Sequence, residues 1–303
     1  MAILDAPAPT AASSLWRTLR LLRRDKLALL AAIVLLALVL AALFGPPLIG
    51  DMATRINLRM RNAPPSFENG FAFLLGADTL GRSLLARLIV GCRNTLGIAF
   101  SAVAIAILVV GVLGLIAGYF GGFVGNAIMR LADIVMSFPS LLLALVVLYI
   151  LGPNVINLII VLAITRVPVY LRTTRAEVLE LRERMFVSAA RLMGSSPGRI
   201  ILVHIVPLVV PTLLTIAAID LAAVILTESG LSFLGLGIQP PEFTWGAMVA
   251  TGRNYLSSAW WLAFWPGLAI MATTLSLTLL ASWARTLNDP HQRWRLEMRR
   301  ERT

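Results

Sequence analysis

The chain has 303 residues, of which 58% are hydrophobic and only 14% are charged, and its mean hydropathy is +0.86. No ordinary soluble domain tolerates so much apolar surface, so the composition excludes a soluble enzyme and indicates an integral membrane protein. The net charge of +11 does not indicate nucleic-acid binding, because the basic residues flank apolar segments instead of clustering in one soluble region.

The first apolar segment, 27–44, follows five basic residues within 1–26, which we expect to form a cytoplasmic N-terminal segment. It is long for the core of a signal peptide and lacks a clear small-x-small cleavage site, so we expect a retained first span. Cys92 is the only cysteine, which excludes an internal disulfide and a cysteine-based metal site.

Six apolar segments are long enough to cross a hydrocarbon core of about 30 Å. They are 27–44, 96–119, 134–151, 155–171, 205–226 and 260–284. We therefore predict an all-α membrane protein with six transmembrane helices, in which 96–285 forms the core with spans two to six. We expect 45–95 to be an external loop that leads into an interfacial helix over 80–93, and 286–303 to be a basic cytoplasmic tail.

Basic residues are distributed unequally between the two sides that these spans define. With the N-terminus inside, 18 Arg or Lys residues lie on the inner side and 7 on the outer side. Because cytoplasmic loops carry the excess of positive charge, both termini and the loop 172–204 are predicted to be cytoplasmic. Arg82, Arg87 and Arg93 on the outer side go against this rule, although charges in longer loops count less.

Several breaks in the apolar pattern predict bends and a folded outer loop. Span three contains Ser137 and Pro139, and span four contains Arg166 and Pro168. We expect both spans to bend there, where neighbouring helices can satisfy the freed backbone groups. Between spans five and six, the segment 229–259 is rich in glycine and proline, which rules out one continuous helix and predicts a partly re-entrant outer loop.

The cytoplasmic segment at about 185–207 is predicted to form a helix, a glycine break and a second helix. Residues 187–193 favour helix, Gly194 suits a left-handed C-terminal cap, and Ser196 with Pro197 provides an N-cap and a first-turn proline. A basic cytoplasmic loop can simply lie on anionic lipid. The small and apolar residues Ala189, Ala190, Leu192 and Met193, flanked by arginines, favour docking of a short helix into a groove of a soluble partner.

Catalytic chemistry has little support in this sequence. His204 and His291 are the only histidines, and no phosphate-binding G-x-x-x-x-G-K-[ST] loop is present, so this chain does not hydrolyse a nucleotide by itself. Asp220 lies inside span five, where a carboxylate is costly and usually faces a bundle interior or a wet pathway. Asp133 and Glu228 lie near span ends, and we expect both to be close to water. An ion-coupled carrier that uses Asp220 and a non-transporting scaffold remain alternatives.

Four sequence blocks together resemble the C-type permease subunits of binding-protein-dependent ATP-binding cassette (ABC) importers of the dipeptide, oligopeptide and nickel group. These blocks are 75–82 with 87–91, 130–139, 189–194 with 204–207, and 231–241 with 245–246. The resemblance covers most of the chain, and the last block is highly specific. It implies a type I importer architecture in which the cytoplasmic "EAA" segment is a coupling helix that docks into an ATPase subunit.

The resemblance also implies roles for individual residues. Coupling positions are Ser188, Ala189, Ala190, Arg191, Gly194, Pro197 and Arg199. Pathway or gate candidates are Asp220, Glu228, Phe233, Gly235 and Gly237. The sequence departs from the family pattern at Ser188, where glutamate is usual, and at Leu208, where asparagine commonly follows the proline. An ionic contact at Ser188 is therefore impossible, and docking would depend on shape, backbone and the arginines.

As a family expectation, the chain is a transport subunit and no enzyme, located in the bacterial inner membrane with both termini in the cytoplasm. Expected partners are a B-type permease, one or two ATPase subunits, an external solute-binding protein and the lipid membrane, without nucleic acid. ATP and Mg would be bound by the ATPase subunits, and no cofactor is expected in this chain. The implied cargo is a di- or oligopeptide, with nickel chelates, glutathione or other peptide-like solutes as alternatives.

Overall fold

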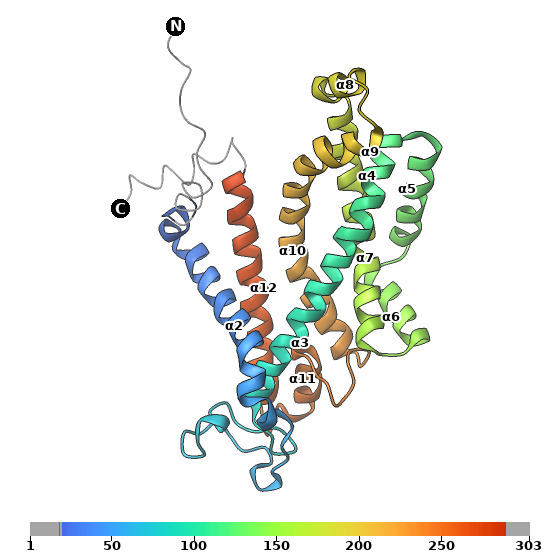
Figure 1. Cartoon of the computed structure of the whole chain (residues 1–303). Helices are drawn as coiled ribbons and strands as arrows, with labels where there is room; N and C mark the ends of the chain where they lie inside the picture. Colours follow the sequence, from blue (N-terminus) through green and yellow to red (C-terminus); the bar gives the residue numbers. More distant parts are fainter. Residues whose placement is uncertain (1–17, 19, 289–303) are drawn as a thin grey trace.

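The computed structural model describes residue 18 and residues 20–288 as an elongated bundle of helices (Figure 1). Most of the predicted N-terminal segment 1–26 and of the predicted tail 286–303 therefore lies outside the described residues. Within the described part the regular secondary structure is helical, with no strand beyond one isolated bridge between Ala77 and Ser83. The all-α class predicted from composition is confirmed.

Five helices are long and apolar enough to cross a membrane within the described residues. They are α2 (Lys26–Thr54); α3 (Leu84–Ile105) continuing through a π-helical segment (Ala106–Val110) into α4 (Gly111–Phe120); α7 (Val155–Arg182); α9 (Pro197–Arg199) continuing through a second π-helical segment (Ile200–Ile205) into α10 (Val206–Phe233); and α12 (Trp261–Asn288). The two composite helices are 37 residues long. At a rise of about 1.5 Å per residue they exceed the thickness of a bilayer core, so their ends extend beyond it.

The predicted third span is a broken one. α5 (Gly122–Met136) and α6 (Ser140–Leu151) meet at an angle of 86°, and only together do they provide a sixth crossing. Pro139 occupies the N-cap position of α6, and the hydroxyl of Ser137 donates to the carbonyl of Asp133 at 2.9 Å. The bend predicted at Ser137 and Pro139 is thus present. α7, in contrast, continues through Pro168 as one helix.

Two predicted boundaries, at the end of α2 and at the start of α3, differ from the structure. α2 does not end at residue 44 but continues through Pro46 and Pro47 to Thr54. Residues 84–93 form no separate interfacial helix, because they are the first turns of α3, capped by the Ser83 hydroxyl that accepts from the amide of Ala86 at 3.1 Å. Gly45 lies against Ile89, where a side chain would clash, and this close packing of α2 on α3 holds both extended helices together.

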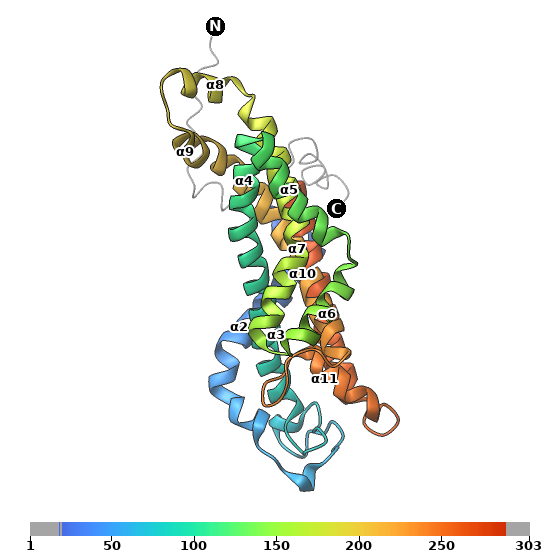
Figure 2. The same cartoon turned by 90° about the vertical axis from the view of Figure 1, so that its right-hand side faces the viewer.

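The short helices lie at opposite ends of the bundle, as both views show (Figures 1 and 2). α8 (Met185–Leu192) and α9 project beyond one end, toward which the first described turns of α2 and the last turns of α12 also point. We call the opposite end the distal end; it carries α11 (Trp245–Gly252) and short 3-10 turns at Leu58–Met60, Phe71–Phe73 and Arg253–Tyr255. The buried apolar residues form two clusters, one toward each end.

Candidate functional site

The segment around α8 has the predicted helix, glycine and helix order. α8 ends at Leu192, and Gly194 has φ +81°, a backbone conformation that favours glycine. The amide of Ser195 donates to the carbonyl of Ala190 at 3.0 Å, which is the hydrogen bond expected of a left-handed helix cap. The Ser196 hydroxyl then accepts from the amide of Arg199 at 3.4 Å, and Pro197 is the first residue of α9. The local prediction is confirmed.

The outer face of α8 is apolar and exposed to an unusual degree. Met185, Leu192 and Met193 are 88%, 90% and 79% exposed, and Ser188 and Ala189 lie between them on the same side of the helix. The other predicted coupling positions, Arg191, Gly194, Pro197 and Arg199, are exposed as well. An exposed apolar patch with a basic border is typical of a surface that a partner covers.

Ala190 is the exception among the predicted docking residues. It is buried together with Val187, and both belong to the hydrophobic cluster that includes Ile200 and Ile205. The expectation that Ala190 shares an exposed apolar face with Ala189, Leu192 and Met193 is therefore wrong. At 3.6 residues per turn, positions 187 and 190 point to the side of the helix opposite 185, 189 and 192. Ala190 attaches α8 to its own protein.

The end of α7, which leads into α8, is hydrogen-bonded to the neighbouring helix α4. Arg182, the last residue of α7, donates from Nη1 to the carbonyls of Gly118 at 3.3 Å and Tyr119 at 3.2 Å. A guanidinium at the carboxyl end of a helix satisfies free carbonyls and opposes the negative end of the helix dipole. Further along the same contact, Gly118 lies so close to Val178 that a Cβ would come within 2.6 Å of its Cβ. α4 and α7 are thus closely packed up to the start of α8.

Asp220 forms an ion pair across two helices. Its Oδ1 lies 3.6 Å from Nη1 of Arg166 on α7, and Nη2 of Arg166 donates to the hydroxyl of Thr227 at 3.2 Å. Both charged side chains are mostly buried. Each residue was singled out from the sequence, but the pairing was missed; the opposite charges in spans four and five were the signal available. In the apolar bundle this pair neutralises two charges and connects α7 with α10.

Glu228 lies in a polar cluster and is fully buried, contrary to the expectation that it would be close to water. Its Oε1 accepts from the Ser232 hydroxyl at 2.6 Å and from the Thr244 hydroxyl at 2.7 Å. Thr244 is the N-cap residue of α11, so the carboxylate connects α10 with that short helix. The prediction failed because the loop between α10 and α11 folds back over the end of α10. Glycine at 246 allows this, since a Cβ there would lie 2.6 Å from the Cα of Ser229.

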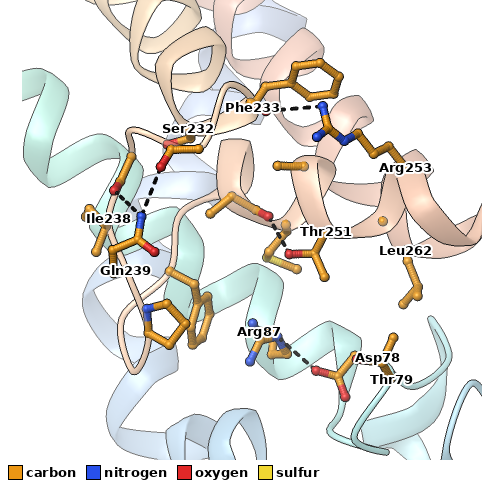
Figure 3. Close-up of a pocket in the computed structure, with 18 of the residues that line it drawn as sticks. Asp78, Thr79, Arg87, Ser232, Phe233, Ile238, Gln239, Thr251, Arg253 and Leu262 are labelled. Carbon is orange, nitrogen blue, oxygen red and sulfur yellow. Dashed lines mark hydrogen bonds and ion pairs between the residues drawn. The ribbon is translucent and has the colours of Figure 1, made fainter. Parts of the chain in front are cut away.

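Phe233, Gly235 and Gly237 lie away from Asp220, around a half-open cavity of about 470 Å³ at the distal end. Gly235 has φ +88°, and Gly237 is packed directly on Ser232. Figure 3 shows Phe233 beside Arg253 on one side of the cavity and Arg87 with Asp78 on the other. The structure therefore places the predicted pathway candidates in two regions: the Asp220 ion pair, and the Glu228 cluster with the adjoining distal cavity, which share Ser232.

The arrangement of these side chains suits contacts between helices and docking of a partner better than catalysis of a reaction. Within the described residues, no group of three or more His, Cys, Asp or Glu side chains gathers where it could hold a metal ion. The polar groups instead connect helices to one another, and the most exposed functional feature is the apolar face of α8. These features define a multi-pass helical membrane protein with a helical arm at one end.

Comparison with protein families identifies that class more closely. Residues 110–294 match the family described as "Binding-protein-dependent transport system inner membrane component", and residues 14–65 match "N-terminal TM domain of oligopeptide transport permease C". The chain belongs to this family of inner-membrane components, which are permease subunits of ABC importers and are not themselves enzymes. It is therefore a multi-pass protein of the inner membrane, and the resemblance seen in the sequence is confirmed.

Curated relatives match over nearly the full chain. The di/tripeptide transport system permease protein DppC of Pseudomonas aeruginosa is 40% identical over 88% of this chain and 88% of its own length. The dipeptide permease DppC of Alkalihalophilus pseudofirmus is 37% identical over 92% of this chain and 91% of its own. The nickel permease NikC of Escherichia coli is 36% identical over 72% of this chain and 78% of its own.

Proposed function

We propose that this chain forms one half of the translocation pathway of an ABC importer for di- or oligopeptides. A B-type permease supplies the other half, and one or two ATPase subunits bind ATP with Mg and supply the energy. An external solute-binding protein delivers the cargo. The support for peptide cargo comes from relatives that are named as di/tripeptide and dipeptide permeases and match about nine tenths of the chain.

The exposed face of α8 carries this proposal. Met185, Leu192 and Met193 project from the end of the bundle instead of packing on it, and two buried residues on the opposite side of α8 hold the helix in place. A short helix with an apolar outer face and a basic border matches the helix-in-groove mode of recognition. In an importer, the groove belongs to the ATPase subunit, and Ser188, which replaces the usual glutamate, leaves the contact dependent on shape and apolar area.

The proposed orientation places α8 in the cytoplasm. The first described turns of α2 and the last of α12 point toward the α8 end, so both termini are assigned to the same side as the coupling segment. The excess of basic residues on that side supports the assignment. The distal end then faces the outside, where the solute-binding protein arrives.

Transmission begins when ATP binding closes the ATPase pair and moves the bound α8 together with the coupling segment of the B-type permease. Because α8 is packed on the Ile200 region and α7 is fastened to α4 through Arg182, a displacement of α8 is passed to α4, α7 and α10 together. Such a movement of packed helices changes the access of the pathway from one side of the membrane to the other.

The proposal is tested by purifying the membrane complex and measuring ATP hydrolysis and peptide uptake in proteoliposomes. Leu192→Glu places a charge on the apolar face of α8, and we expect at least a tenfold loss of ATPase association and of uptake, because a charge in a docking groove is costly. Leu58→Glu is the matched control, since Leu58 is 68% exposed at the distal end. A wild-type chain that never copurifies with an ATPase would contradict the proposal.

Nickel chelates and glutathione remain the second candidate cargo class. The nickel permease and the glutathione transport system permease protein GsiD of Pectobacterium atrosepticum are 36% and 35% identical to this chain, against 36% to 40% for the peptide permeases. Competition decides between the classes: unlabelled dipeptide abolishes uptake of labelled dipeptide if peptides are the cargo, and excess glutathione or chelated nickel leaves it unchanged. An ion-coupled carrier is disfavoured because Asp220 is already paired with Arg166.

A further inference from the structure

The cavity at the distal end is lined by residues of two sequence blocks, 75–91 and 231–246, to which the proposed mechanism assigns no role. One wall comes from the segment before and within the first turns of α3, with Asp78, Arg82 and Arg87. The other comes from the loop between α10 and α11 and from the end of α11, with Phe233, Gln239 and Arg253 (Figure 3). A volume of about 470 Å³ is ample for a side chain that enters from the surface.

One carboxylate serves two guanidinium groups in this cavity. Oδ1 of Asp78 accepts from the amides of Leu80 and Arg82, both at 2.9 Å. Its Oδ2 lies 2.7 Å from Nε of Arg82 and 3.5 Å from Nε of Arg87. Both oxygens of Asp78 are thus occupied, while each guanidinium has five N–H groups to donate. Arg82 and Arg87 therefore have N–H groups for which Asp78 has no acceptor site left.

The remaining contacts of the arginines are weak or non-polar. Arg87 Nη1 reaches the carbonyl of Ala53 at 3.4 Å, and its guanidinium lies 3.9 Å from the centre of the Phe243 ring. Arg253 stacks on Phe233 at 4.7 Å and reaches the Phe233 carbonyl at 3.5 Å. Counting Glu242 and Asp78, the lining has three cations and two anions. The cavity therefore has a positive excess, carried by the partly buried Arg82 and Arg87 and by the exposed Arg253.

We propose that this cavity receives an acidic side chain of the solute-binding protein when that protein docks on the distal end. The inference rests on the proposed function, which makes the distal end external. A carboxylate that enters between Arg87 and Arg253 would accept charge-assisted hydrogen bonds and balance the positive excess. Charge complementarity of this kind sets docking specificity and the rate of encounter. It also gives a reason for arginines on the outer side, where the charge rule does not expect them.

The test is a titration of uptake with the solute-binding protein, using the complete importer in proteoliposomes. Arg253→Gln removes an exposed guanidinium, and Arg87→Gln removes a mostly buried one. We expect each variant to raise the half-saturating concentration of binding protein about tenfold, with the maximal uptake rate unchanged, because a docking charge acts on affinity and not on translocation. The increase should shrink at high salt, where exposed charges are screened.

Arg61→Gln is the matched control, since Arg61 is an exposed arginine of the same end that does not line the cavity. Because Arg87→Gln also removes packing on Phe243, Arg253→Gln keeps the test valid if the first variant fails to fold. Unchanged half-saturation in the Arg253 variant overturns the inference, whether or not the maximal rate changes. A wild-type complex without ATP-driven uptake would instead contradict the proposed function, so the two failures are distinguishable.

Discussion

Arg166 and Asp220 show how single residues of this bundle hold its helices together. Both lie in segments that the apolar pattern marks as membrane spans, and neither charge would be tolerated there alone. Their separation of 3.6 Å is long for a direct hydrogen bond, so the pair contributes mainly by neutralising two buried charges. The cost of breaking the pair should exceed any benefit from forming it.

Removal of one partner is therefore expected to be more harmful than removal of both. Asp220→Asn should lower the stability of the purified protein by about 3 kcal/mol, because it leaves the Arg166 charge unpaired in an apolar environment. The double variant Arg166→Met with Asp220→Leu should recover most of that loss, since well-packed apolar residues replace a buried ion pair at little cost. Thermal unfolding in detergent measures both changes.

The ion pair between Arg172 and Asp133 provides the comparison, because its atoms are 2.9 Å apart and both side chains are about half exposed. The comparison uses Arg172→Met and Asp133→Leu, singly and together. Neither single change at that pair should cost more than about 1 kcal/mol. If Asp220→Asn were as stable as the wild type, the Arg166 charge would have another partner and the pair would not connect α7 with α10.

At the scale of elements, the proposed mechanism requires the connection between α7 and α4 to carry the motion of α8 into the membrane. Arg182→Gln removes the charged cap from the carbonyls of Gly118 and Tyr119 while keeping a side chain of similar length. We expect ATP hydrolysis to continue and the number of peptides imported per ATP to fall several-fold, because α7 can then move without α4. Parallel assays of ATPase activity and uptake measure this ratio.

Arg184→Gln is the control for that experiment, because Arg184 pairs with Glu180 on the exposed surface of the same stretch and touches no carbonyl of α4. Its ratio of uptake to hydrolysis should equal that of the wild type. Equal ratios in both variants would show that the Arg182 contact does not transmit motion, even if both proteins assemble normally.

Sequence patterns predict these elements well where the cause is local. Gly194 and Pro139 act through their own backbone preferences, so the end of α8 and the break before α6 could be read from the chain. Helix ends that depend on packing against other helices could not be predicted from the sequence. Gly45, directly before Pro46 and Pro47, allows α2 to lie close against α3, and no local pattern predicts such a contact.

The candidate site likewise has features that the sequence predicts and features that only the tertiary fold determines. The composition of α8 predicts an apolar helix, but which residues face outward depends on the cluster that buries Val187 and Ala190 from behind. From the sequence, Glu228 is predicted to be a carboxylate near water at the end of a span, but the loop between α10 and α11 folds back and brings Thr244 within 2.7 Å of it. Residue types are thus visible in the sequence, whereas the pairing of residues distant along the chain depends on the tertiary fold.

The whole molecule has two dissimilar ends, and its function depends on which end faces the cytoplasm. The proposed function requires the apolar face of α8 to meet an ATPase on the inside and the arginine-lined cavity to meet a solute-binding protein on the outside. The chain suits a labelling test of this orientation, because Cys92, its only cysteine, is buried and its thiol contacts the carbonyl of Leu38 at 3.4 Å. The natural sequence is therefore a background in which a membrane-impermeant maleimide should find no reactive thiol.

Two single-cysteine variants then report the two ends. Gly198, within α9, is exposed and has open space where a Cβ would lie, and Ser257 is exposed in the connection from α11 to α12, so we choose Gly198→Cys and Ser257→Cys. In intact spheroplasts we expect the maleimide to label Ser257→Cys and to leave Gly198→Cys unlabelled until the membrane is permeabilised. The reason is that the excess of basic residues at the α8 end keeps that end in the cytoplasm. The reverse pattern would place α8 outside the cell, away from any ATP, and neither the coupling role of α8 nor the docking role of the distal cavity could then hold.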